Sequence, residues 1–177
     1  MTELLGADSH VIIVPEGGFE RVAVDILMDA NAFVFPADNV IEVSRVRKAV
    51  DIQDRYLTTE YDWPVSILRI LDSRKERFVL GNLYRDRYPV INVYTRPEAE
   101  ILAIIHEGRI NDYYKVESAM KPNEFCKQYL GMPDIKKPSF LRSYWDAGAL
   151  ISAAGEYKHL HKLGKDELCL ADILRVG

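Results

Sequence analysis

The sequence predicts an α/β fold: an open, mostly parallel sheet with helices on both faces, followed by a helical extension. Two observations support this fold. Short apolar runs alternate with helix-like stretches over the first two-thirds of the 177 residues, as in proteins whose parallel strands are connected by helices. The last third has helical spacing punctuated by proline and glycine. We therefore expect a sheet domain at residues 1–117 and a helical extension at residues 118–177, packed on that domain.

The predicted strands are short and largely apolar. Residues 10–14 are apolar on both faces, which is typical of a central parallel strand. Further strands are expected at residues 33–35, 40–46, 65–71 and 90–94. Helices are expected between the strands at residues 19–29, 46–60 and 97–115, and in the extension at residues 122–130, 139–154 and 166–174.

Composition favours a soluble, cytoplasmic protein. The net charge of -4 and the isoelectric point near 5.6 neither indicate nor exclude a nucleic-acid binder, because a local basic patch matters more than the total charge. No apolar run approaches the roughly 20 residues that span a bilayer. The acidic first ten residues lack the pattern of a signal peptide. Cys126 and Cys169 are far apart in sequence, which argues against a zinc site or a disulfide and fits a reducing compartment.

Acidic residues follow three of the predicted strands. Glu16 comes after the first, with Glu20 four residues further on; Asp72 follows the strand at 65–71, and Glu98 and Glu100 follow the strand at 90–94. Ligands of open α/β sheets collect at the carboxyl ends of the strands, so these acids would converge there. Such oxygen ligands suit Mg²⁺ or Mn²⁺ better than zinc.

Each acid also has a simpler interpretation. The Glu-Gly-Gly sequence that begins at Glu16 is common in turns, where glycine supplies a positive φ. Asp72 is also placed to cap the next segment, and Glu98 and Glu100 complement the start of a helix, which favours negative charge. Capping does not require an acid after three strands of one sheet, so the combination points to a metal site more strongly than any single acid.

The segment at residues 74–88 interleaves basic and aromatic residues. Its arginines, lysine and aromatic residues are Arg74, Lys75, Arg77, Arg85, Arg87, Phe78, Tyr84 and Tyr88. Such a segment fits binding of a nucleic-acid backbone with base stacking, or a solvated loop with aromatic residues packed beneath it. The extension is also locally basic, which fits an arm that holds nucleic acid or a surface that docks a partner protein or a second copy of the chain.

The acidic motifs resemble those of the Toprim domain of topoisomerases, primases, small maturation ribonucleases and OLD-type nucleases. Glu16, Gly17 and Glu20 match the first Toprim motif, a strand that leads into Glu-Gly with an acid one helical turn later. Asp72 matches the first Asp of the second motif, Asp-x-Asp, but Arg74 stands in place of the second Asp.

A closer resemblance is to the RloB-like, abortive-infection branch of Toprim proteins, which functions in phage defence. Members carry a proline after a late strand, a glutamate three residues on, and an apolar helix that ends near a histidine. Pro97, Glu100 and His106 keep this order and spacing. The correspondence covers roughly residues 10 to 108, and it leaves the helical extension without a counterpart.

The resemblance implies a Toprim-like fold and a nuclease that cleaves DNA or RNA with Mg²⁺ or Mn²⁺. Glu16 would be a metal ligand or the general acid/base, and Asp72, Glu100 and Glu20 would hold the metal. Arg74, Lys75, Arg77 and His106 are the candidates for substrate binding, and Arg74 is suited to bind a phosphate.

Two alternatives remain open from the sequence. The first is a degenerate Toprim fold that binds nucleic acid or regulates a partner without catalysis, because Arg74 replaces the second Asp. The second is an unrelated doubly wound protein whose Glu-Gly-Gly turn binds a small anion at the start of a helix.

Overall fold

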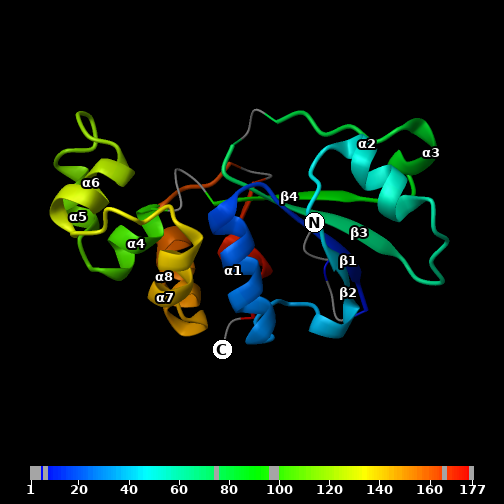
Figure 1. Ribbon diagram of the computed structural model, residues 1–177, viewed down its shortest axis with the longest axis horizontal. Coiled ribbons are helices and arrows are strands. Elements are labelled where there is room, and N and C mark those ends of the chain that lie inside the picture. Colours follow the sequence, from blue (N-terminus) through cyan, green and yellow to red (C-terminus); the bar gives the residue numbers. More distant parts are fainter. Residues whose placement is uncertain (1–4, 6–7, 74–75, 96–99, 165–166, 176–177) are drawn as a thin grey trace.

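The expected α/β fold is confirmed by a sheet of five parallel strands (Figure 1). The computed structural model describes residues 5, 8–73, 76–95, 100–164 and 167–175. The strand order across the sheet is β2-β1-β3-β4-β5. The strands are β1 (His10–Pro15), β2 (Val40–Val43), β3 (Val65–Leu71), β4 (Val90–Tyr94) and β5 (Leu168–Cys169).

The strand order places a topological switch point between β1 and β3. The chain runs from β1 to its neighbour β2 at one edge, then returns past β1 to form β3, β4 and β5 on the other side. Connections therefore leave β1 and β3 in opposite directions, and the crevice outside their carboxyl ends is where open α/β sheets bind ligands.

Helices cover both faces of the sheet (Figure 1). One face is covered by α2 (Ala49–Ile52), the π-helical turn η3 (Gln53–Leu57) and α3 (Asn82–Arg85). The other face carries the larger core and the remaining helices. They are α1 (Gly18–Asp29), α4 (Glu100–His106), α5 (Ile110–Tyr114), α6 (Pro122–Tyr129), α7 (Pro138–Tyr144) and α8 (Ala147–Leu160). In the described part of the chain, no helix is both long and apolar enough to cross a membrane.

The central strands are buried on both faces, as their continuous apolar sequence predicts. In β1, Val11 and Ile13 pack into the larger core, whereas Ile12 and Val14 pack into the smaller one. Every residue of β3 is buried, including Arg69, which is 2% exposed. Arg69 is compensated by an ion pair with Glu76 at 2.7 Å and by the Phe78 ring, whose centroid lies 4.3 Å from its guanidinium carbon.

Several expected elements differ in the structure. The expected helix at residues 166–174 is the short strand β5 and a 3-10 turn, η4 (Leu170–Ile173), because β5 pairs with the end of β4 at the sheet edge. The expected helix at 139–154 is two helices, α7 and α8, and Asp146 between them caps α8 by accepting the Ala149 N–H at 2.8 Å. The expected strand at 33–35 is reduced to one bridge between Phe33 and Leu174. Another 3-10 turn, η2 (Ala37–Asn39), precedes β2.

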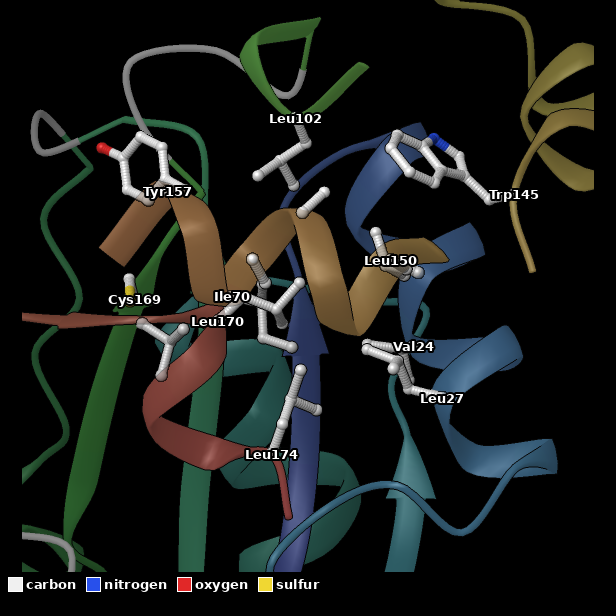
Figure 2. Close-up of a cluster of buried hydrophobic side chains, with 14 of the residues drawn as sticks. Val24, Leu27, Ile70, Leu102, Trp145, Leu150, Tyr157, Cys169, Leu170 and Leu174 are labelled. Carbon is white, nitrogen blue, oxygen red and sulfur yellow. The ribbon is translucent and has the colours of Figure 1, made fainter. Parts of the chain in front are cut away.

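The larger core is shared between residues 1–117 and the extension. Figure 2 shows Leu150 and Tyr157 of α8 in one cluster with Val24 and Leu27 of α1 and Ile70 of β3. Helix α8 packs mainly against α4, and α7 packs against α1. The extension therefore completes the hydrophobic core of the sheet as well as adding β5 to its edge.

Replacing Leu150 by alanine tests this shared core. Leu150 is 0% exposed, so Leu150→Ala should lower the free energy of unfolding by about 2–5 kcal/mol. The matched control is Leu160→Ala at the end of the same helix, where the side chain is 40% exposed and the loss should stay within about 0.5 kcal/mol. Urea unfolding followed by tryptophan fluorescence and circular dichroism should show one coincident transition. Two separated transitions would contradict a shared core.

Candidate functional site

Glu16 is fixed over the carboxyl end of β3. Its backbone N–H continues the pairing of β1 with β3 by donating to the Ile70 carbonyl at 2.9 Å. Its side-chain Oε2 accepts the backbone N–H of Asp72 at 3.0 Å and that of Ser73 at 3.3 Å. One glutamate thus holds the end of β1 to the first residues after β3, at the switch point of the sheet.

The carboxyl groups of Glu16 and Asp72 interact directly. The pKa of Glu16 is raised from its ordinary value of 4.5, first by partial burial and then by the negative charge of Asp72 and a hydrogen bond between the two side chains. The backbone N–H groups of Asp72 and Ser73 oppose this shift. A carboxyl pair of this kind is stabilised when it retains a proton or binds a cation, because either one reduces the repulsion between two negative charges.

Glu20 is a buried carboxyl group on the first turn of α1. It is 2% exposed, and its Oε1 lies 2.8 Å from the Thr95 hydroxyl just beyond β4. Burial raises the pKa of Glu20, and the charge of Asp72 adds to the shift. A β-carbon on Gly17 would lie 2.8 Å from Oε2 of Glu20, so the glycine leaves room for this carboxyl group. Gly17 therefore accommodates the buried Glu20 carboxyl group as well as forming the turn.

Glu100 is the second buried acid at this edge of the sheet, after Glu20. It begins α4 and is 5% exposed. The ammonium group of Lys136 lies 3.1 Å from Oε1, close enough for an ion pair, but this buried oxygen accepts no hydrogen bond from the described residues. The extension thus brings a cation to an acid that the sequence analysis placed in the metal site.

Glu20, Asp72 and Glu100 line one cleft of about 370 Å³, named here the acidic cleft. Its opposite wall comes from the extension and includes Lys136 and Trp145. The Trp145 side chain is buried, and its Nε1 has no hydrogen-bond partner among the described residues. The three acids that the sequence predicts to lie close together do line one cleft, whereas the presence of Trp145 in that cleft was not predicted.

The side chains of the acidic cleft fit a hard divalent cation by type. Carboxylate oxygens are the ligands that Mg²⁺ and Mn²⁺ prefer, and the buried Glu100 Oε1 still lacks a hydrogen-bond donor. Across the described ranges, no three Asp, Glu, His or Cys side chains form a group that could hold an ion as they stand. The metal therefore stays a prediction.

The expected substrate-binding residues that the structure describes, Arg77 and His106, do not line the acidic cleft. Arg74 and Lys75 lie outside the described residues, as do Pro97 and Glu98. Arg77 is exposed on the segment after β3. The aromatic residues of that segment, Phe78, Tyr84 and Tyr88, pack on the smaller core. This packing matches the interpretation of a charged loop with aromatic residues beneath it.

His106 lies at the end of α4 among aromatic residues of the extension. Its ring is 5.8 Å from that of Tyr144 and 5.4 Å from that of Trp145, between centroids. His106 is exposed and does not line the acidic cleft, although its neighbour Trp145 does. The structure therefore relates His106 to the cleft only through Trp145.

Sequence reasoning missed a second cleft on the other side of Glu16. This basic cleft, of about 460 Å³, is lined by Arg21, Arg45, Arg47 and Lys48 together with Glu16, Gly17 and Asp51. The signal was available, because three of the four cations follow β2 in the sequence Ser-Arg-Val-Arg-Lys at the same edge of the sheet.

Comparison with protein-family models, with curated proteins and with solved structures found no match to this chain. The Toprim resemblance accordingly remains an expectation from the motifs around Glu16, Asp72 and Glu100.

Replacing Asp72 by asparagine tests the carboxyl pair through stability. A raised pKa means that the folded state holds the Glu16 proton more tightly than the unfolded chain, so this stability is present at low pH and is lost as the pH rises through the raised pKa. Asp72→Asn removes the repelling charge and should raise the melting temperature at pH 7 by up to about 2–4 °C. As the pH falls and Glu16 takes up its proton, the repulsion weakens, and the gain should shrink.

Thermal unfolding from pH 3 to pH 8 measures this effect. The matched control is Asp62→Asn, because Asp62 is exposed and lines neither cleft. A lower melting temperature for Asp72→Asn at pH 7, or an equal gain at pH 3, would contradict the repulsion between the two carboxyl groups.

Proposed function

We propose that the protein is a nuclease that cleaves phosphodiester bonds in DNA or RNA with Mg²⁺ or Mn²⁺. The observation that carries the proposal is the acidic cleft, where Glu20, Asp72 and Glu100 meet from three separate segments at the carboxyl edge of the sheet. Glu16 stands beside Asp72 at the same edge. Acids placed in this way, at the switch point of a parallel sheet, suit binding of a divalent ion and a phosphate.

The acids divide into two roles. Glu20, Asp72 and Glu100 would hold the metal, which neutralises the phosphate and makes its bound water a stronger nucleophile. Glu16 has a raised pKa and lies outside the acidic cleft's lining, next to Asp72, so it is suited to take up and return a proton as general acid/base. Lys136 can offer its ammonium group to a phosphate oxygen.

The resemblance to abortive-infection proteins extends the proposal to a role in phage defence in the cytoplasm. Cys126 and Cys169 are buried and form no disulfide among the described residues, which supports a reducing compartment. The basic residues of the extension support nucleic acid as the main partner, with a protein partner or a second copy of the chain as further candidates.

A second candidate function is binding without catalysis. The ion pair between Lys136 and Glu100 favours it, because the ammonium group stands where a cation would otherwise neutralise this acid. The replacement of the second family Asp by Arg74 points the same way. Both functions predict nucleic-acid binding, but only the nuclease predicts metal-dependent cleavage.

A cleavage assay separates the two functions. The purified protein should cleave labelled DNA or RNA with Mg²⁺ or Mn²⁺ and lose this activity in EDTA. Glu16→Gln and Asp72→Asn should each lower the rate by at least about 100-fold, since they remove a proton-transfer group and a metal ligand. Glu42→Gln on the exposed side of β2 is the matched control and should keep the full rate. Cleavage that survives both site substitutions would refute the nuclease.

Competition between Lys136 and the metal gives an independent test. If the ammonium group and a divalent ion neutralise the same carboxylate, Lys136→Met should bind Mn²⁺ several-fold more tightly than the unmodified protein. Titration calorimetry and the rise in melting temperature with Mn²⁺ both measure the affinity. Lys137→Met is the control, because Lys137 pairs with Asp134 instead. Unchanged or weaker Mn²⁺ binding in Lys136→Met would exclude a metal at Glu100.

A further inference from the structure

The basic cleft concentrates positive charge in an acidic protein. The chain as a whole has a net charge of -4, yet four cations line this one cleft beside the carboxyl ends of β1 and β2. Among the described residues, two acids share the lining, Glu16 and Asp51. The cleft therefore has an excess of positive charge on its wall.

Two of the four cations are held in place without being neutralised. Arg47 donates from Nη1 to the backbone carbonyl of Glu16 at 2.9 Å, and Arg21 donates from Nη2 to the backbone carbonyl of Ser44. A carbonyl group orients a guanidinium but does not cancel its charge, so the remaining N–H groups stay available to an anion.

The other two cations are exposed at the rim. Arg45 and Lys48 form no ion pair within the part of the chain that the structure describes. A pair of fixed guanidinium groups flanked by two exposed cations suits phosphate oxygens, which Arg binds in a planar, two-pronged geometry.

The basic and acidic clefts adjoin each other. Gly17 lines both, and the successive residues Glu20 and Arg21 on the first turn of α1 serve the acidic and the basic cleft respectively. Both clefts open along the carboxyl edge of the sheet, one beside β1 and β2 and the other beside β1 and β3. A chain of phosphates lying along this edge would meet cations first and the acids next.

We propose that the basic cleft binds phosphate groups of a nucleic-acid strand on one side of the phosphate that enters the acidic cleft. The position of the cleaved phosphate rests on the proposed nuclease function, whereas binding of the strand at Arg21, Arg45, Arg47 and Lys48 does not. A linear polyanion fits the observations better than a free nucleotide, because the basic cleft adjoins the acidic cleft at Gly17, so a phosphate chain can continue past the cations.

Binding without cleavage tests the proposal. Fluorescence anisotropy of labelled single-stranded DNA and RNA oligonucleotides is measured in EDTA from 50 to 300 mM salt. The double variant Arg45→Ala/Lys48→Ala removes the two rim cations and leaves the orienting bonds of Arg21 and Arg47 intact. It should weaken binding and lower the slope of log affinity against log salt by about 1.4, or about 0.7 for each lost phosphate contact.

Two control variants make the test specific. Arg55→Ala/Lys115→Ala removes two exposed cations that lie outside the extension and line neither cleft, and it should leave the slope unchanged. Arg45→Lys/Lys48→Arg keeps the charges and should restore most of the affinity. Circular dichroism and melting temperature establish that every variant is folded.

Three outcomes would overturn the proposal: an unchanged slope in Arg45→Ala/Lys48→Ala, an equal loss in the Arg55/Lys115 control, or no binding by the unmodified protein. Competition identifies the phosphate source. An unlabelled oligonucleotide should displace the probe far better than pyrophosphate or a nucleoside triphosphate. Equal displacement would assign the cleft to a free phosphate ligand and refute the binding of a strand.

The cleavage assay then separates this proposal from the nuclease. Loss of binding in Arg45→Ala/Lys48→Ala without any metal-dependent cleavage would keep the strand-binding cleft and reject the nuclease. Cleavage that depends on Glu16 and Asp72, with unaltered binding in Arg45→Ala/Lys48→Ala, would keep the nuclease and reject the strand-binding cleft.

Discussion

The clamp between Glu16 and the end of β3 is the interaction on which the proposed site depends. Parallel pairing fixes β1 and β3 up to Pro15 and Ile70, and Glu16 extends it by accepting the backbone N–H groups of Asp72 and Ser73. This contact sets the distance between the carboxyl groups of Glu16 and Asp72 at the switch point. The pKa of Glu16 is raised first by partial burial and then by the charge of Asp72, and a bound cation would offset both effects.

The site also needs the extension. Lys136 and Trp145, which flank α7, line the cleft together with the acids. The neighbouring helix α8 is anchored by the core that Leu150 and Tyr157 share with α1 and β3. Charge is divided across the carboxyl edge of the sheet, with acids beside β3 and cations beside β2. In a single cleft the acids and the cations would pair with one another, whereas this division would leave the acids to a metal ion and the cations to phosphate groups.

Continuous apolar runs made the central strands predictable. Residues 10–15, 65–71 and 90–94 have little alternative to burial in a parallel sheet, and Glu16, Asp72 and Glu100, which follow them, lie at one edge of that sheet. The strand β5 was not predictable, because two residues carry no periodicity and apolar residues at helical spacing also fit a 3-10 turn. The break between α7 and α8 depends on one cap at Asp146, which a continuous helical pattern conceals.

The long-range contacts of the site were beyond sequence reasoning for a similar reason. Lys136 and Glu100 are paired by the packing of the extension, and no local pattern relates them. The Ser-Arg-Val-Arg-Lys segment after β2 is different, since it lies at the end of a predicted strand and could have been recognised by the reasoning used for the acids. The sequence left two interpretations open for Phe78, Tyr84 and Tyr88, base stacking or packing beneath a charged loop, and their side chains pack on the smaller core.

The most direct test of the account is an anomalous difference map from crystals grown with millimolar Mn²⁺, because it locates the ion independently of activity. The account predicts a peak in the acidic cleft within coordinating reach of Asp72 and of Glu20 or Glu100, with the ammonium group of Lys136 withdrawn from Glu100. A map without a peak in that cleft, in which Lys136 still contacts Glu100, would contradict it.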